Sequence, residues 1–270
     1  MTLKTRQLSD GDGCFSYRES GAGAPVVLIH GVGLQSAAWQ PQITALAQNY
    51  QVFALDMPGH GGSDPLHSGA TLEDFVVWGE RAIRALVSAP VRVAGHSMGA
   101  LIAGGLAVRK PALVERVALL NSVFRRDPQA RLAVEARAAQ IGQGVIDVES
   151  PLARWFSDDA GEQNVRALTA GWLSEITVEG YATAYAAFAG GDATFADGLA
   201  AVACPLLALT GGDDPNSTPA MAREMAAAAR NGKAVIIDGQ RHMVNLTAPE
   251  LVNAHLLDWL ALPAVTEDKP

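Results

Sequence analysis

The sequence has only two cysteines, Cys14 and Cys204, among its 270 residues. Two cysteines are too few for a disulfide framework, and neither belongs to a CxxC or Cys/His spacing that would bind zinc. We therefore expect no metal site and predict that both cysteines are small buried side chains. A chain of this length can bury a large core without a disulfide or a metal, so stability does not require either.

The sequence also lacks any run of roughly 18 or more apolar residues, which a membrane-spanning helix would need. Residues 1–10 lack the apolar stretch of a signal peptide. Positive charge is not in excess either, because 20 Lys and Arg stand against 28 Asp and Glu, a formal net charge of −8. This balance argues against binding to nucleic acid or to an anionic membrane. We therefore expect a cytoplasmic protein that binds neither.

Short apolar runs bounded by turn residues recur along the chain, and each has the composition of a strand buried on both faces. They are residues 25–30, 51–56, 91–95, 116–120, 205–210 and 234–238. Segments with helical periodicity lie between them. This alternation predicts the α/β class, with a mostly parallel central sheet and helices on both faces.

Several helix ends can be predicted from capping residues. Thr-Leu-Glu-Asp at residues 71–74 is expected to open one helix, and Thr218 followed by Pro219 another, which Gly232 could close. Residues 247–250, Thr-Ala-Pro-Glu, have the spacing of a capping box and precede the last apolar helix.

The alternation of strands and helices breaks between residues 122 and 201, where no buried strand is indicated. We predict that 122–201 form an inserted helical cap, and that 1–121 and 202–270 form the core. The cap holds eight of the sixteen aromatic residues, which either line an apolar pocket or pack the cap onto the core. They are Phe124, Trp155, Phe156, Trp172, Tyr181, Tyr185, Phe188 and Phe195.

Residues 95–99, Gly-His-Ser-Met-Gly, lie between a predicted strand and an apolar helical run that starts at Ala100. This is G-x-S-x-G in the context where it forms a nucleophile elbow, a strained strand-to-helix turn that exposes the serine hydroxyl. The glycines on either side leave room for the chain to pass closely. We therefore predict that Ser97 is a nucleophile.

A serine hydroxyl is a weak nucleophile, so it needs a base and an orienting acid, expected downstream in the order Ser, acid, His. His242 alone among the six histidines lies in a loop after a late strand and before the last helix, so we predict that it is the general base. The acid is Asp213 or Asp214, after the strand that ends at Thr210. The other histidines are expected in turn motifs (His30, His96) or at loop and surface positions (His60, His67, His255).

The tetrahedral intermediate of acyl transfer carries an oxyanion that two backbone N–H groups can stabilise. We expect one donor at Met98, directly after the nucleophile. The second is expected at Val32, in the His-Gly-Val-Gly turn of residues 30–33 that follows the first predicted strand of the core. Neither G-x-G-x-x-G after a strand nor G-x-x-x-x-G-K-[ST] is present, so no nucleotide cofactor is indicated.

Taken together, these motifs resemble the α/β-hydrolase superfamily across nearly the whole chain outside the cap. They are His-Gly-Val-Gly at 30–33, Asp-Met-Pro-Gly-His-Gly-Gly-Ser at 56–63, Gly-His-Ser-Met-Gly at 95–99, Gly-Gly-Asp-Asp at 211–214 and His242. The sequence is most similar to the group of 3-oxoadipate enol-lactonases, small carboxylesterases, cofactor-free perhydrolases and carbon–carbon hydrolases. The resemblance implies that Asp214 is the acid, with Asp213 as the alternative, and that Asp56 belongs to a structural turn.

The resemblance implies no cofactor and a small-molecule ester, lactone or ketone as substrate. Our leading hypothesis is a serine hydrolase that cleaves a carboxylic ester or lactone through an acyl-enzyme. A second hypothesis keeps the triad but cleaves a carbon–carbon bond of a dienone acid or 1,3-dicarbonyl compound, whose carboxylate the cap arginines could bind. Those arginines, which otherwise lie on solvated helix faces, are Arg125, Arg126, Arg131, Arg137, Arg154 and Arg166. A third is a ligand-binding protein without turnover. The sequence does not indicate an oligomeric state.

Overall fold

The six apolar runs form the parallel part of a single eight-stranded sheet in the computed structural model, which describes residues 2–8 and 13–263. The order of the strands is β1-β2-β4-β3-β5-β6-β7-β8. The parallel strands are β3 (Pro25–Ile29), β4 (Gln51–Leu55), β5 (Val91–His96), β6 (Val114–Leu120), β7 (Leu206–Gly211) and β8 (Gly232–Ile237). The predicted fold class, an α/β protein with a mostly parallel sheet and the α/β-hydrolase fold, is confirmed.

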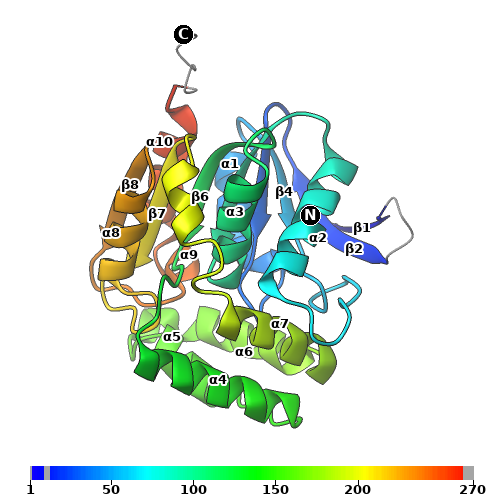
Figure 1. Cartoon of the computed structure of the whole chain (residues 1–270), viewed down its shortest axis with the longest axis vertical. Coiled ribbons are helices and arrows are strands. Elements are labelled where there is room, and N and C mark those ends of the chain that lie inside the picture. The colour runs from blue at the N-terminus through cyan, green and yellow to red at the C-terminus, as the bar shows by residue number, and fades with distance from the viewer. Residues whose placement is uncertain (1, 9–12, 264–270) are drawn as a thin grey trace.

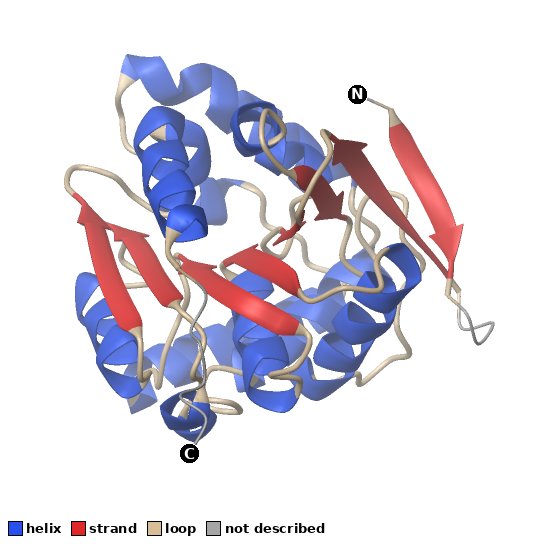
Figure 2. Ribbon diagram, turned by 90° about the horizontal axis from the view of Figure 1, so that it is seen from above, coloured by secondary structure: helices blue, strands red, loops and turns tan. Residues whose placement is uncertain are grey.

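Two strands at one edge of the sheet were not predicted. β1 (Leu3–Gln7) pairs antiparallel with β2 (Cys14–Ser20), and β2 pairs antiparallel with β4. All five residues of β1 are exposed, so this strand has no apolar pattern by which the sequence could indicate it. The antiparallel pair forms the edge of the sheet that carries the N-terminus (Figure 2).

Helices cover both faces of the sheet (Figure 2). α1 (Gln40–Leu46) and α10 (Pro249–Ala261) pack on one face. α2 (Leu72–Leu86), α3 (Met98–Arg109) and α8 (Pro219–Ala228) pack on the other.

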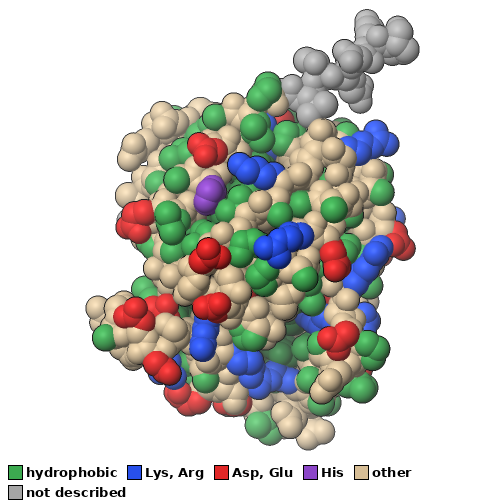
Figure 3. All heavy atoms as spheres, turned by 90° about the vertical axis from the view of Figure 1, so that its left-hand side faces the viewer, with side chains coloured by type: hydrophobic (Ala, Val, Ile, Leu, Met, Phe, Trp, Pro, Cys, Tyr) green, Lys and Arg blue, Asp and Glu red, His purple; other side chains and the backbone are tan. Residues whose placement is uncertain are grey.

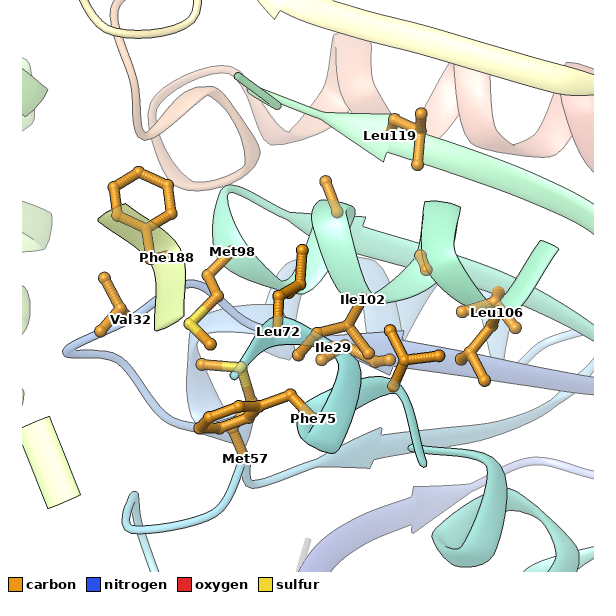
Figure 4. Close-up of a cluster of buried hydrophobic side chains, with 14 of the residues drawn as sticks. Ile29, Val32, Met57, Leu72, Phe75, Met98, Ile102, Leu106, Leu119 and Phe188 are labelled. Carbon is orange, nitrogen blue, oxygen red and sulfur yellow. The ribbon is translucent and has the colours of Figure 1, made fainter. Parts of the chain in front are cut away.

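The two faces have separate apolar cores, and β3 shows how one strand serves both. Val26 and Leu28 belong to the cluster under α1 and α10, whereas Val27 and Ile29 belong to the cluster under α2 and α3. Because successive side chains of a strand point to opposite faces, a strand between two helical layers must be apolar throughout. Figure 4 shows part of the second cluster, in which Ile29 lies among side chains of α2 and α3.

Four α-helices follow β6 and precede β7, and they lie together at one end of the sheet (Figure 1). They are α4 (Pro128–Gly142), α5 (Glu149–Trp155), α6 (Gln163–Glu175) and α7 (Val178–Gly190), with the short 3-10 helices η2 (Ala160–Glu162) and η3 (Asp197–Ala201). The structure assigns no strand to residues 122–201. All eight aromatic side chains of this segment are buried. The division into a core and a cap at these boundaries stays a prediction.

The start of α2 follows the capping pattern that the sequence indicates. The carboxylate of Asp74 accepts hydrogen bonds from the backbone N–H of Thr71 at 2.7 Å and from its hydroxyl at 2.8 Å. These bonds hold the pKa of Asp74 below its usual value. α8 likewise starts at Pro219, as predicted, but Gly232 does not close it, because α8 ends at Ala228 and Gly232 is the first residue of β8.

The capping box predicted at residues 247–250 is wrong. Thr247 is the last residue of a separate short helix, α9 (Val244–Thr247), and α10 starts at Pro249 after an Ala248 that makes no side-chain cap. The Thr247 hydroxyl instead bonds the Gln240 side chain at 2.6 Å and the Met243 carbonyl at 3.2 Å. The threonine therefore stabilises the preceding loop, a role that its spacing from Glu250 does not reveal.

Neither cysteine is fully buried, contrary to the sequence prediction. Cys14 begins the edge strand β2 and Cys204 lies in the loop before β7, and both are half-buried free thiols. Partial burial raises the pKa of Cys204 to about 11. Among the residues that the structure describes, no helix is long and apolar enough to cross a lipid bilayer.

We expect the substitution Asp74→Ala to lower the free energy of unfolding by about 1 kcal/mol, since it removes the side-chain acceptor that caps α2. Urea denaturation monitored by circular dichroism measures this change. Glu175→Ala is the control, because Glu175 is an exposed acidic residue at the C-terminal end of α6 and caps no helix N-terminus. Equal unfolding midpoints for Asp74→Ala and the unmodified protein would contradict the capping role.

Candidate active site

Ser97 lies in a strained turn between β5 and α3. Its φ is 54° and its ψ is −116°, a backbone conformation that residues with a side chain rarely adopt. The turn can form only because the residues two positions before and after the serine, Gly95 and Gly99, have no side chain. A Cβ at Gly95 would come within 2.0 Å of the Gly99 carbonyl oxygen, and a Cβ at Gly99 within 2.1 Å of the Ile29 carbonyl oxygen. The G-x-S-x-G motif is therefore a steric requirement of this turn.

The turn after β3 runs directly against the elbow. A Cβ at Gly31 would lie 3.0 Å from the Cβ of Ser97, so this turn also needs a glycine. α3 starts at Met98, two residues earlier than the apolar run that begins at Ala100. The first N–H groups of a helix have no partner within the helix, so the one at Met98 points out of its N-terminus.

The two predicted oxyanion donors lie in the turn after β3 and directly after the serine. Within the part of the chain that the structure describes, the backbone N–H groups of Val32 and Met98 donate to no protein acceptor. Val32 and Ser97 line the same cavity. In Figure 4, the side chains of Val32 and Met98 lie at the same end of the apolar cluster. Both N–H groups are thus free to donate to a ligand in this cavity, such as the acyl oxygen of a substrate, on which negative charge develops when a serine attacks the acyl carbon.

Two buried histidines fix the turn that carries Val32. The ring of His60 accepts a hydrogen bond from the Gly33 N–H at 2.9 Å, and the ring of His30 accepts one from the Met57 N–H at 2.9 Å. The ring centroids are 5.3 Å apart. His60 lies in a loop, one of the two positions that the sequence analysis allowed, but it is not a surface residue, since it is only 1% exposed. Its position depends on contacts between two turns that are distant in the sequence.

Asp56 holds the same region together rather than contacting a histidine of the site. Its carboxylate accepts from the Ser36 N–H at 2.6 Å and from the Gly62 N–H at 3.1 Å. The Ser63 hydroxyl donates to the Asp56 carbonyl at 2.7 Å. This is the structural turn that the motif of residues 56–63 implies.

The structure brings Asp214, and not Asp213, to His242. The His242 Nδ1 group donates to Asp214 Oδ2 at 2.7 Å, and both side chains are buried. Asp213 is exposed, and its backbone N–H bonds the Gln240 carbonyl at 2.9 Å. The two loops meet because β7 and β8 are adjacent parallel strands, whose carboxyl ends lie at the same edge of the sheet.

Asn121 is a residue of this site that sequence reasoning missed. It follows β6 with a φ of 48°, and its side-chain amide donates to Asp214 Oδ2 at 2.9 Å. The other carboxylate oxygen of Asp214 accepts from the N–H groups of Asn216 and Ser217 at 2.8 and 3.1 Å. Burial raises the pKa of Asp214, but the neighbouring His242 and these hydrogen bonds outweigh it and hold the pKa below its usual value. An asparagine after a strand is the only signal that the sequence offers.

Three further contacts fix the loop that carries His242. His96 donates from Nε2 to the His242 carbonyl at 2.8 Å, and the indole of Trp155 stacks on the His242 ring with centroids 5.8 Å apart. Arg241 donates to the carbonyls of Ala153 at 3.0 Å and Phe156 at 2.7 Å, next to the end of α5. These contacts connect α5, in the helical segment at one end of the sheet, to the loop that carries His242.

Ser97 and His242 line one cavity of about 290 Å³ between the sheet and the inserted helices. The apolar part of its wall includes Trp155, Tyr185 and Phe188. Three arginines of the inserted helical segment also line the cavity, namely Arg126, Arg137 and Arg154. In Figure 3, Lys and Arg side chains gather on the lower part of the visible face, where the surface is hollowed.

Within residues 2–8 and 13–263, histidine, cysteine and carboxylate side chains form no group of three or more that could hold a metal ion. The chemistry that the described arrangement can support is acyl transfer. It combines the hydroxyl of Ser97, which lines the cavity, a histidine held by a carboxylate, and two free backbone N–H groups in the neighbouring turns.

Comparison with known proteins agrees with this geometry. Residues 26–255 match the model of the family described as the alpha/beta hydrolase family. The (E)-2-((N-methylformamido)methylene)succinate hydrolase of Acinetobacter baylyi is 49% identical over 260 residues, which cover 96% of this chain and 98% of that protein. The 3-oxoadipate enol-lactonase 1 of the same organism is 30% identical over 231 residues, 83% of this chain and 84% of that protein.

A solved structure extends the similarity to three dimensions. The enol-lactonase from Burkholderia xenovorans superposes with a TM-score of 0.84 at 25% sequence identity. The superposition covers 96% of this chain and 100% of that one.

The buried histidines around the elbow predict how stability depends on pH. Burial lowers the pKa of His30 to about 4 and that of His60 and His96 to about 3, from 6.5. Below pH 6.5 the unfolded chain binds protons that these folded histidines do not. Their contribution to stability is therefore complete above pH 6.5 and is lost as the pH falls to about 4 for His30 and about 3 for His60 and His96. We expect the free energy of unfolding to fall by about 1 kcal/mol per pH unit and histidine in this range.

Urea denaturation at several values between pH 5 and 8 measures this slope. His60→Gln keeps an acceptor for the Gly33 N–H but removes one titrating group, so the slope should decrease. His67→Gln, at an exposed position, is the matched control and should leave the slope unchanged. Identical slopes in all three proteins would refute the assignment.

Proposed function

Because this chain belongs to the α/β-hydrolase family, we propose that it hydrolyses an acyl bond of a small molecule through an acyl-enzyme on Ser97. The observation that carries the proposal is the shared cavity, at which the Ser97 elbow meets a His242 that is bonded to Asp214 at 2.7 Å. A buried carboxylate on Nδ1 leaves the Nε2 atom of the histidine as the acceptor of the serine proton.

The proposed reaction has two halves. His242 accepts the Ser97 proton as the hydroxyl oxygen attacks the acyl carbon, and the N–H groups of Val32 and Met98 bind the resulting oxyanion. The protonated histidine then gives its proton to the leaving group, which departs and leaves the acyl group on Ser97. In the second half, a water molecule loses a proton to His242 and attacks the acyl carbon, and the acid is released as the serine is protonated again.

We favour a formamide carbon–nitrogen bond as the one that is cleaved. The proposal rests on the 49% identity to (E)-2-((N-methylformamido)methylene)succinate hydrolase over nearly the full length of both chains. The formyl nitrogen in a compound of that name is conjugated through a carbon–carbon double bond to a carboxylate. This conjugation withdraws the nitrogen lone pair and makes the nitrogen a better leaving group than that of a simple amide. The acyl-enzyme would be a formyl ester of Ser97, and its hydrolysis would yield formate.

A carboxylic ester or lactone is the second candidate. It is supported by the 30% identity to 3-oxoadipate enol-lactonase 1 and by the structural similarity to the Burkholderia enol-lactonase. The residues would act in the same roles, with an enol or alcohol oxygen as the leaving group in place of nitrogen. We further propose that residues 122–201 act as a cap that encloses this substrate, because the segment supplies most of the wall opposite Ser97.

The substitution Ser97→Ala is expected to lower kcat/KM by about 10⁴-fold or more, since the nucleophile is lost while the fold is retained. Formate release from (E)-2-((N-methylformamido)methylene)succinate tests the first candidate. Ring opening of 3-oxoadipate enol-lactone and hydrolysis of p-nitrophenyl acetate, butyrate and octanoate test the second. Ser174→Ala, on the exposed side of α6, is the matched control.

The pattern of turnover separates the candidates. Serine-dependent formate release favours the formamide bond, and serine-dependent turnover of the lactone or esters alone favours the second candidate. A folded Ser97→Ala variant that retains full turnover would overturn the mechanism, and a wild type inert toward every one of these substrates would overturn the proposed function.

Asn121 is expected to act on the reaction through Asp214. Asn121→Gly removes the amide at a position where the positive φ suits glycine, so backbone strain is not added. A hydrogen bond to a charged group contributes about 1.5 to 3 kcal/mol, so we expect kcat/KM to fall about 10- to 100-fold. Because Asn121 holds the carboxylate, its loss should also move the lower limb of the pH profile, which a structural role alone would not do. An unchanged profile would contradict this positioning role.

A further inference from the structure

The cavity wall has an unusual charge balance. It contains the side chains of Arg126, Arg137 and Arg154, and none of the residues that line it is an aspartate or a glutamate. The chain as a whole has a formal net charge of −8. The wall of the cavity that the proposed substrate must enter is therefore positively charged, although the chain as a whole is acidic. A cavity lined by one sign of charge attracts ligands of the other sign.

Arg126 is the most buried of the three. Its side chain is 3% exposed, and its Nη1 atom contacts the carbonyls of Phe188 at 3.4 Å and Ala189 at 3.3 Å. The guanidinium also lies 4.4 Å from the centre of the Phe188 ring. Its Nη2 atom, however, is buried and has no hydrogen-bond partner among the described residues. A buried guanidinium nitrogen without a partner is costly unless a ligand accepts its hydrogen bond.

Asp192 does not neutralise this site. It is the only carboxylate paired with Arg126 in the described part of the chain, at 3.3 Å, and it also pairs with Arg131 at 3.1 Å. Its second oxygen accepts the backbone N–H of Arg126 at 2.6 Å. One carboxylate therefore serves two guanidinium groups, and the pair of arginines keeps one net positive charge.

Arg137 and Arg154 form a second positive site. Arg137 lies on α4 on the face that it shares with Val134 and Ala130, which are three and seven residues away and also line the cavity. Arg154 comes from α5, and burial and the like charge of Arg137 both lower its pKa. The nearest carboxylate to Arg137 is that of Asp147, a half-exposed residue 3.9 Å away.

Arg154 has no ion pair with any carboxylate that the structure describes. Two guanidinium groups placed together and half-buried repel each other, and an anion between them removes that repulsion. Tyr185 lines the same cavity as these arginines. Burial raises the pKa of Tyr185, and the nearby positive charges of Arg137, Arg154 and Arg126 oppose that rise.

We propose that this cavity is a dicarboxylate site, in which Arg126 Nη2 binds one carboxylate of the substrate and Arg137 with Arg154 bind the other. The inference deepens the proposed function and rests on it for the position of the scissile bond. Two carboxylates held on the inserted segment would fix the substrate backbone while its acyl carbon lies at Ser97. Such fixed orientation is a large part of what an enzyme contributes to a reaction rate.

Two carboxylates fit the site better than one. A single carboxylate on Arg126 would leave Arg137 and Arg154 uncompensated, and one between the latter pair would leave Arg126 Nη2 without an acceptor. The cavity of about 290 Å³ has room for a four-carbon diacid with a small substituent. Guanidinium groups also suit carboxylates, since their parallel N–H groups match both oxygens.

The binding of succinate to the Ser97→Ala variant tests the inference without any turnover. We expect calorimetry at low ionic strength to show that succinate binds at least about tenfold more tightly than its monoamide, succinamate, and that the diamide, succinamide, binds weakest. The affinity for succinate should fall with added salt. Equal affinity for the three compounds, or no binding of succinate at millimolar concentration, would overturn the proposal.

Substitution of single arginines tests the assignment of the two sites. In the Ser97→Ala background, Arg154→Gln should weaken succinate binding by about tenfold or more and abolish the preference over succinamate. Arg126→Gln should do the same, and since it is buried, its thermal unfolding is measured in parallel. Arg166→Gln, which removes a cap arginine paired with Glu149 at 2.8 Å outside the cavity, is the matched control.

The outcomes distinguish the two proposals. Arginine-dependent succinate binding in a protein that turns over none of the acyl substrates would support the dicarboxylate site and overturn the proposed function. Serine-dependent turnover together with succinate binding that Arg154→Gln leaves within twofold would overturn the dicarboxylate site alone.

Discussion

The position of Ser97 depends on close contact between three backbone segments. The elbow turns at a positive φ, and its glycines lie where any Cβ would overlap a carbonyl oxygen of the elbow itself or of β3. A Cβ at Gly31 would lie 3.0 Å from the Cβ of Ser97, so the next turn also packs closely on the elbow. These close contacts set the spacing of the hydroxyl from the N–H groups of Val32 and Met98. The buried contacts of His30, His60 and Asp56 then keep the second turn in place.

Much of the fold and part of the site could be predicted from the sequence because they follow from local rules. Strands covered on both faces are apolar throughout, and the elbow needs glycines at fixed spacing, so both are readable in a single chain. β1 was missed because an exposed edge strand carries no such pattern. Thr247, His60 and Asn121 were misassigned or overlooked because their roles depend on partners far away in the sequence, such as Gly33 for His60 and Asp214 for Asn121. The sequence left Asp213 and Asp214 open, and only the packing of the β7 and β8 loops brings one of them to His242.

The inserted helices and the histidine loop form one connected unit in the structure. Arg241 bonds carbonyls next to the end of α5, and Trp155 from that end stacks on His242, the residue that follows Arg241. A displacement of α5 would therefore move the proposed base as well as the cavity wall. The same helix carries Arg154. The arginine proposed to bind the substrate and the tryptophan that stacks on His242 thus share one element of seven residues, so a ligand bound at Arg154 would act on the position of His242.

The electrostatics of the cavity connect these features. A protein with an excess of acidic residues keeps three arginines on a partly buried wall, where each loses hydration and where the described carboxylates compensate them only in part. Replacing such groups by apolar residues would stabilise many folds, so their presence is easiest to explain by a ligand that carries the missing negative charge. The buried carboxylate of Asp214 differs from these arginines because both of its oxygens accept hydrogen bonds within the protein, from His242, Asn121 and two backbone N–H groups. The site therefore separates its charges: the carboxylate of Asp214 is satisfied within the protein and holds His242, while the guanidinium groups remain available to the anionic substrate that we propose.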